Sequence, residues 1–119
     1  MTSIIRLVLR EHAAAPLLAS RTMGARLRRL IELALSDEQI VQIDFSDIGV
    51  TQSFTDELVG VLAYKYGPAV MQSIQFRGCT TDHQKIIKFV VNHRLETRQV
   101  GPRQAKISAP REGCHSAFA

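Results

Sequence analysis

Four short apolar runs along the chain predict β-strands. They cover residues 3–10, 16–19, 39–45 and 73–77. The runs are rich in Ile, Val, Leu and Phe, which favour strands. In the clearest run, Val41, Ile43 and Phe45 would point to one face of a sheet. Asp44 would point to the other face, because successive side chains of a strand alternate. The first two runs are separated by a short turn and predict an opening hairpin.

Three further segments place apolar residues three or four positions apart, which predicts amphipathic helices. They cover residues 21–36, 54–66 and 82–95. Each follows a capping signal, in which a side-chain oxygen accepts a hydrogen bond from a helix amide. The predicted caps are Ser20, Ser53 in S-F-T-D and Thr81 in T-D-H-Q. In the second helix, Phe54 and Leu58 would face the core.

The order of these elements predicts an α/β fold. Strands that alternate with helices imply right-handed crossovers and a largely parallel sheet. We therefore expect a single small two-layer domain over residues 1–95, with about four strands, three helices and one antiparallel hairpin. From residue 96 onward, Gly-Pro and Ala-Pro pairs interrupt every pattern. Residues 96–119 are predicted to be a flexible tail with one short edge strand near Lys106–Ile107.

Composition and charge exclude several classes of protein. No run reaches the roughly 20 apolar residues of a membrane span, and we expect no signal peptide in the first ten residues, which alternate polar and apolar positions. Two cysteines make no disulfide framework, so a cytoplasmic location is expected. The four histidines lack metal-ligand spacing, and no phosphate-binding glycine motif is present. We therefore expect no metal and no cofactor. The net charge of +4 comes from the two ends of the chain, and the middle is acidic.

The most specific pattern lies between Val41 and Leu58. A strand that reads V-Q-I-D-F-S-D-I precedes a helix start that reads T-Q-S-F-T-D-E-L. This pair of motifs resembles the uncharacterised bacterial STAS-like domain family, and the resemblance extends over about residues 4–95. STAS domains proper are best known as anti-anti-sigma factors. They bind a histidine-kinase-like ATPase that phosphorylates a Ser or Thr at the start of this helix.

The resemblance implies a regulatory, protein-binding module of signalling rather than an enzyme, with no catalytic residues. Ser53 is the hydroxyl nearest to the STAS phospho-acceptor, although Phe54 stands where STAS domains have a small residue. A helix cap is the alternative role of Ser53. As the third helix residue, Asp56 would complete that cap, and Glu57 would be an exposed contact for a basic partner.

The predicted partner-binding segment also contains Ser46, Gln52 and Thr55. Asp44 is expected to organise the loop that follows its strand, by accepting hydrogen bonds from loop amides. Two other classes of function are left open. One is a nucleic-acid-associated protein that uses the basic ends of the chain, which the shortage of aromatic residues disfavours. The other is a small enzyme that uses Asp44 or Glu57, for which no supporting histidine is in view. The sequence leaves an oligomer open.

Overall fold

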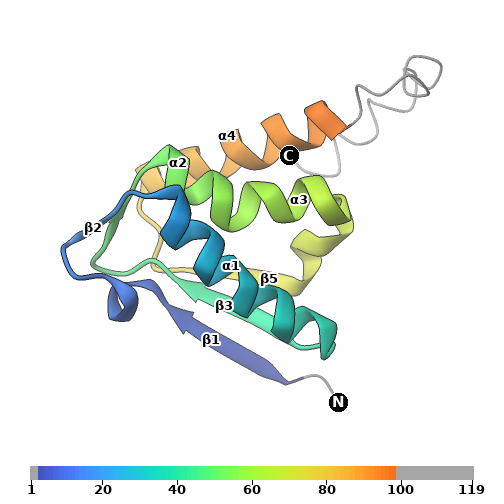
Figure 1. Cartoon of the computed structure of the whole chain (residues 1–119), viewed down its shortest axis with the longest axis horizontal. Coiled ribbons are helices and arrows are strands. Elements are labelled where there is room, and N and C mark those ends of the chain that lie inside the picture. The colour runs from blue at the N-terminus through green and yellow to red at the C-terminus, as the bar shows by residue number, and fades with distance from the viewer. Residues whose placement is uncertain (1–2, 99–119) are drawn as a thin grey trace.

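The computed structural model describes residues 3–98 and arranges them in two layers, a parallel sheet and the helices that cover one of its faces (Figure 1). The strands are β1 (Ile4–Val8), β3 (Ile40–Asp44) and β5 (Ile74–Arg77), in the order β1-β3-β5. Their register aligns Val8, Asp44 and Arg77, so the three C-terminal ends lie side by side. The predicted α/β class and the two-layer architecture are confirmed.

The predicted opening hairpin is wrong. After β1 the chain forms a 3-10 turn, η1 (Leu9–His12), and then β2 (Leu17–Leu18). This strand pairs in parallel with β4 (Gly49–Val50), which lies in the loop after β3. The reason is that Leu9 is fully buried and carries the chain past the end of the sheet, so the chain does not turn back along β1.

The first and second predicted helices are present. The first is α1 (Arg21–Ser36), and Ser20 caps it by accepting a hydrogen bond from the Met23 amide, as predicted. The second, which we call the central helix, runs without a break over residues 52–66. It consists of α2 (Gln52–Thr55), a π-helical turn η2 (Asp56–Gly60) and α3 (Val61–Tyr66).

The N-cap of the central helix is Thr51, so the predicted capping role of Ser53 is wrong. The Thr51 hydroxyl accepts a hydrogen bond from the Phe54 amide at 3.1 Å, and the Thr51 backbone is extended as an N-cap requires. The capping hydroxyl oxygen therefore comes from a threonine two positions before the predicted serine. Ser53 is therefore an exposed residue within the first turn.

The start of α4 (Thr81–Arg98) also differs by one residue from the prediction. The Thr80 hydroxyl accepts a hydrogen bond from the His83 amide, and His83 Nδ1 accepts one from the Thr80 amide. An imidazole thus takes the place of the usual carboxylate in a capping box. A 3-10 segment, η3 (Pro68–Ser73), joins the central helix to β5. Because α4 continues to Arg98, it passes the predicted end near residue 95; the rest of the predicted tail lies outside the described residues.

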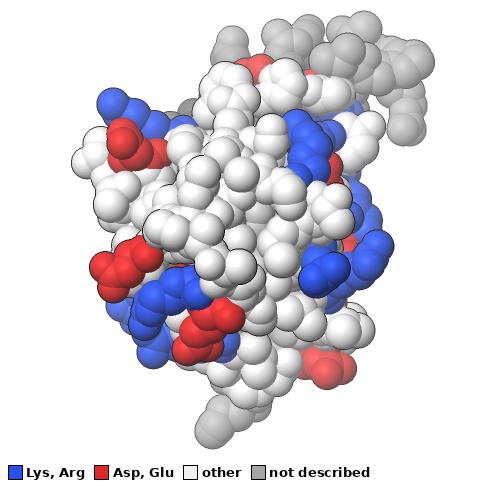
Figure 2. All heavy atoms as spheres, turned by 60° about the vertical axis from the view of Figure 1, so that its left-hand side comes forward, with Lys and Arg blue, Asp and Glu red and all other residues white. Residues whose placement is uncertain are grey.

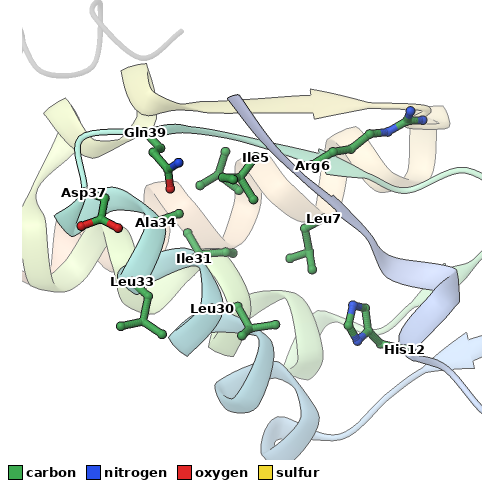
Figure 3. A pocket seen from close by; sticks show the side chains of 11 residues that line it. Ile5, Arg6, Leu7, His12, Leu30, Ile31, Leu33, Ala34, Asp37 and Gln39 are labelled. Carbon is green, nitrogen blue, oxygen red and sulfur yellow. The ribbon is translucent and has the colours of Figure 1, made fainter. Parts of the chain in front are cut away.

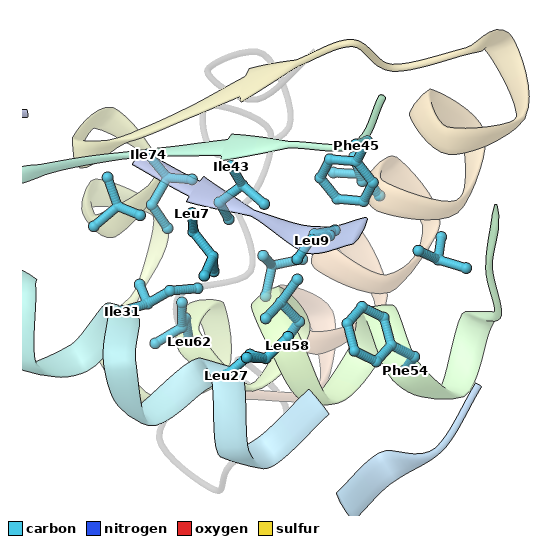
Figure 4. Close-up of a cluster of buried hydrophobic side chains, with 14 of the residues drawn as sticks. Leu7, Leu9, Leu27, Ile31, Ile43, Phe45, Phe54, Leu58, Leu62 and Ile74 are labelled. Atoms are coloured by element: carbon cyan, nitrogen blue, oxygen red, sulfur yellow. The ribbon is translucent and has the colours of Figure 1, made fainter. Parts of the chain in front are cut away.

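The core lies between the sheet and the helices (Figure 4). Alternate residues of the strands supply the sheet side, as the predicted alternation requires. The largest fully buried side chains of the whole core are Leu9, Val41, Ile43, Phe45, Leu27, Ile31, Phe54, Leu58, Val59, Leu62, Val90 and Val91. Phe54 and Leu58 face this core, which confirms the predicted register of the central helix. No helix within residues 3–98 has the length and apolar character needed to cross a membrane.

Phe54 provides a direct test of this packing. Because its ring is fully buried, Phe54→Ala should lower the free energy of unfolding by about 3–5 kcal/mol, through lost burial and the cavity left behind. The matched control is Phe89→Ala, because Phe89 is exposed and should change stability by about 0.5 kcal/mol or less. Urea titration measures both, and equal midpoints for the two variants would contradict the assigned core.

Candidate functional site

The predicted partner-binding segment divides into exposed and buried residues at the start of the central helix. Gln52 and Ser53 are exposed on the first turn. Thr55 is fully buried, and its hydroxyl donates a hydrogen bond to the Thr51 carbonyl. Asp56 is buried as well. The helical period places Thr55 and Asp56 on the inner face of the helix. They are therefore residues of the interior and not the partner contacts that the sequence predicted.

Asp56 is the centre of an ion-pair cluster that joins three helices. Arg94 of α4 binds both carboxylate oxygens, with Nε–Oδ1 and Nη2–Oδ2 distances of 2.9 and 2.7 Å. Arg21 of α1 donates to Oδ2 at 2.9 Å. Burial raises the pKa of Asp56, but the hydrogen bonds from Arg94 and Arg21 outweigh burial and hold that pKa below its ordinary value. Asp56 thus fixes α1 and α4 against the central helix.

Glu57 belongs to the same cluster and is not the free acid that the sequence predicted. Arg28 Nη1 lies 3.0 Å from its Oε1, and Arg21 Nη1 lies 3.2 Å from its Oε2. Arg28 also donates to the Glu57 carbonyl at 2.8 Å. Since the chain's own arginines already bind this carboxylate, its expected role as a contact for a basic partner is corrected to an internal one.

Two glycines permit this cluster. A Cβ at Gly60 would collide with Asp56 Oδ1, so the absence of a side chain lets the carboxylate lie along its own helix. A Cβ at Gly24 would lie 2.7 Å from the Phe54 carbonyl, so glycine at this position lets α1 approach the central helix closely. Glycine is unfavourable inside helices. A glycine inside a predicted helix is therefore the feature of the sequence that indicates close packing, here at Gly24 and Gly60.

Asp44 organises the end of β3, as predicted. Its Oδ1 accepts a hydrogen bond from the Ser46 amide at 2.9 Å, and its Oδ2 accepts one from Arg6 at 2.7 Å. The hydroxyl and amide of Ser46, together with Arg6, hold the pKa of Asp44 far below its ordinary value. Gly78, at a φ of 65°, packs against Ser46, where a Cβ would collide with its hydroxyl. Ser46 is thereby half-buried beside this carboxylate.

Three separate segments without any charged residue meet at the end of the molecule where Ser53 lies. The segments are residues 13–20, 48–55 and 78–81, and we call the surface formed by their exposed residues the neutral end. The β2–β4 pairing joins the first two segments, and the Thr51 hydroxyl donates to the Ala19 carbonyl at 2.9 Å. His83 Nε2 donates to the Ile48 carbonyl at 2.9 Å and ties in the third segment.

The exposed part of the neutral end includes one large apolar side chain and several uncharged polar ones. Leu17 is 51% exposed, and Gln52 and Ser53 are exposed as well. Figure 2 brings this end forward and shows a broad uncharged area with Lys, Arg, Asp and Glu around its rim. Gln52 and Ser53 of this surface were predicted from the sequence, and residues 13–20 were not, although neither segment of the sequence contains a charged residue.

The neighbouring groups do not form a metal site. Within residues 3–98, no three His, Cys, Asp or Glu side chains come together in a way that could hold a metal ion. Asp44 and Glu57, the two acids that an enzyme would use, are both bound by arginines. The arrangement is that of an ion-paired scaffold with Ser53 exposed on the first turn of the central helix.

Asp44 predicts how stability depends on pH. Its pKa is lower in the folded chain than the ordinary 3.8, so the unfolded chain takes up its proton first as the pH falls. The free energy of unfolding should therefore decrease below about pH 4, and Asp44→Asn should reduce that decrease between about pH 7 and pH 3. Asp47→Asn, at an exposed residue of the same loop, is the control. Identical acid profiles for the parent and Asp44→Asn would contradict the assigned contacts.

Gly60 predicts an inversion of the usual helix preference. Gly→Ala inside a helix ordinarily stabilises by about 1 kcal/mol. Here the new Cβ would displace the Asp56 carboxylate, so Gly60→Ala should lower the free energy of unfolding. Combining Gly60→Ala with Asp56→Ala removes the displaced group, and the effect of the alanine at position 60 should become smaller or change sign. Urea unfolding of the four proteins in this cycle measures the coupling; additive effects would contradict the contact.

A family model described as a STAS-like domain of unknown function matches residues 23–84, from the first turn of α1 to the first turn of α4. No curated protein and no solved structure shows a significant match to the chain. The matched region contains the central strand β3, the whole central helix, Asp44 and the acids of the Asp56 cluster. The chain belongs to this family of STAS-like domains.

Proposed function

We propose that this protein is a regulatory module that binds another protein through its neutral end, and that the partner is a histidine-kinase-like ATPase. The observation that carries the proposal is the uncharged exposed surface around Ser53. A cytoplasmic location and the lack of a catalytic activity of its own belong to the same proposal. The resemblance to STAS domains supports the choice of partner, and the residues support the choice of surface.

The neutral end has the chemistry of a protein interface. The centres of such interfaces are depleted of charged residues, while their rims are polar and accessible. Leu17 stands exposed on a two-stranded ladder whose backbone hydrogen bonds hold it in place. Desolvating this surface removes no unpaired charge from water, so a partner can cover it at low electrostatic cost.

Ser53 is suited to be a switch within this surface. Its hydroxyl does not cap the central helix, because Thr51 does so, and modification of Ser53 therefore leaves the cap intact. A phosphate there would add about −1.5 to −2 charges close to the positive end of a helix. Asp56 and Glu57 lie one turn further along, but Arg21, Arg28 and Arg94 already bind them and reduce the repulsion. The new charge would lie in an otherwise neutral interface, which would release the partner.

Two of the four arginines of α1 are already paired and are not free for a nucleic-acid partner. Arg21 and Arg28 are bound by acids of the central helix. Their charges thus serve the fold rather than a phosphate backbone. Nucleic-acid binding would weaken steeply with salt through counterion release, whereas an uncharged protein interface would weaken little.

Photo-crosslinking tests the proposed surface. A photo-reactive amino acid in place of Leu17 should crosslink the partner in cells of the native host, and mass spectrometry should identify it as a histidine-kinase-like ATPase. The control position is Tyr66, which is exposed at the other end of the central helix. Crosslinks from position 66 but not from position 17 would contradict the surface. A partner of another class, captured from position 17, would contradict only the ATPase.

Binding to the captured partner then tests the switch. Ser53→Asp and Leu17→Asp should each weaken binding by about tenfold or more, because each buries a charge in a neutral interface. Ser53→Ala should bind like the parent and should lose phosphorylation by the partner, measured by mass spectrometry after incubation with ATP. Equal affinity of Ser53→Asp and the parent would contradict a switch at this residue.

A further inference from the structure

The flank of α1 beside the edge of the sheet carries an unusual concentration of exposed apolar side chains. Leu33 is 66% exposed, Leu30 is 47% exposed and Ile5 of β1 is 41% exposed. They line a hollow of about 410 Å³ between α1 and β1 (Figure 3). Figure 3 shows Leu30 and Leu33 on the outer side of α1, with Ile31 and Ala34 turned toward the sheet. This surface is separate from the neutral end.

Leu30 and Leu33 belong to a stripe that follows α1. Arg26, Leu30, Leu33 and Asp37 are spaced by four, three and four residues, and all four are exposed. At about 100° per residue, they fall within an arc of about 60° on one side of the helix. The spacing is that of the seam along which two helices pack. The helix thus presents one continuous face beyond the sheet edge.

The stripe is complementary to itself when it is reversed. If two copies of α1 pack antiparallel about a point between residues 31 and 32, Leu30 of one copy meets Leu33 of the other. In the same arrangement, Arg26 of one copy meets Asp37 of the other, and this contact occurs twice. A surface that matches itself under a two-fold rotation is the requirement for a closed dimer. Both the apolar and the charged positions satisfy it.

The charges at the two ends of the stripe have no ion-pair partner in the described part of the chain. Among the ion pairs between residues 3 and 98, none involves Arg26 or Asp37. Asp37 also lies at the C-terminal end of α1, where the helix dipole disfavours a carboxylate. A cation from a second copy would satisfy Asp37 and offset this penalty.

The sheet edge beside the stripe is open as well. β1 pairs with β3 on one side, and within the described sheet it has no neighbour on the other. A strand edge with free amides and carbonyls is a template for pairing with another chain. Because the stripe points sideways from the sheet, a two-fold axis through it runs along the sheet normal. That axis brings the two β1 edges toward each other in antiparallel orientation.

We propose that a second copy of this chain covers the α1 flank, in a symmetric dimer that pairs Leu30 with Leu33 and Arg26 with Asp37 across the two-fold axis. Leu30, Leu33 and Ile5 of both copies become buried at its centre, with the charged pairs outside them. The neutral end lies on another part of each copy, so the dimer presents two neutral ends.

Sedimentation velocity of the full-length chain tests this proposal from low micromolar to submillimolar concentration. The parent should form a dimer, and Leu33→Asp should be a monomer throughout that range. Arg26→Asp and Asp37→Arg should each raise the dissociation constant of the dimer by about tenfold or more, because each replaces two attractive pairs with two repulsive ones. Phe89→Asp and Lys85→Asp, on exposed positions of α4, are the matched controls and should remain dimeric.

Mixing the two charge variants gives the sharpest result. In a heterodimer of Arg26→Asp with Asp37→Arg, one copy carries an acid at both positions and the other carries an arginine at both. Each of the two contacts across the axis is then between an acid and an arginine, so the mixture should dimerise more tightly than either variant alone. The double variant Arg26→Asp/Asp37→Arg should dimerise by itself, because it restores an attractive pair at both contacts.

A monomeric parent at every concentration would overturn the proposal, as would a dimer that survives Leu33→Asp. A double variant that stays monomeric would overturn the antiparallel register. Circular dichroism spectra that match the parent show that each variant is folded.

Discussion

The carboxylate of Asp56 is the interaction on which the arrangement of the helices depends. It receives Arg94 from α4 in a bidentate contact and Arg21 from α1, so a single buried anion joins three helices that are far apart in the sequence. A buried charge is tolerated only when it is paired and hydrogen-bonded, and removal of one partner leaves the other uncompensated. The π-helical turn and Gly60 give the carboxylate room along its own helix. Glu57, Arg28 and Gly24 extend the same constraint along α1.

This internal use of charge determines what the surface can offer. Arg21, Arg28 and Arg94, which a sequence alone could assign to phosphates or to a basic helix face, are held against acids of the central helix. The end of the molecule beside them is left with segments that carry no charge, and these are the segments that the β2–β4 ladder and the Thr51 hydroxyl bring together. An accessible surface without charge therefore borders directly on the most highly charged part of the interior.

Much of the fold was predictable from the sequence because its signals are local. The alternation in β3, the inward position of Phe54 and the Ser20 cap each depend on a few neighbouring residues. The errors concern choices between equivalent local signals or contacts over long distances. Thr51 and Ser53 both offer a capping oxygen, and only the path of the chain from β4 favours Thr51. The parallel pairing of β2 with β4 joins segments about 30 positions apart, and nothing within residues 13–20 reveals it. Glu57 was expected to be exposed because its arginine partners come from another helix.

The role proposed for Ser53 rests on how it differs from the residues on either side. Apart from the exposed Gln52, the polar residues around it each have a structural role, since Thr51 caps the helix, Thr55 is buried against the backbone, and Asp56 and Glu57 bind arginines. Ser53 has none of these roles and stands exposed between them. A hydroxyl that the fold does not need can change its charge without a large loss of stability, and the Asp56 cluster one turn further along ties the helix that carries it to α1 and α4. This separation of scaffold from accessible group is what a regulatory site requires, and it is why the proposed switch is assigned to Ser53 rather than to the threonines or acids on either side.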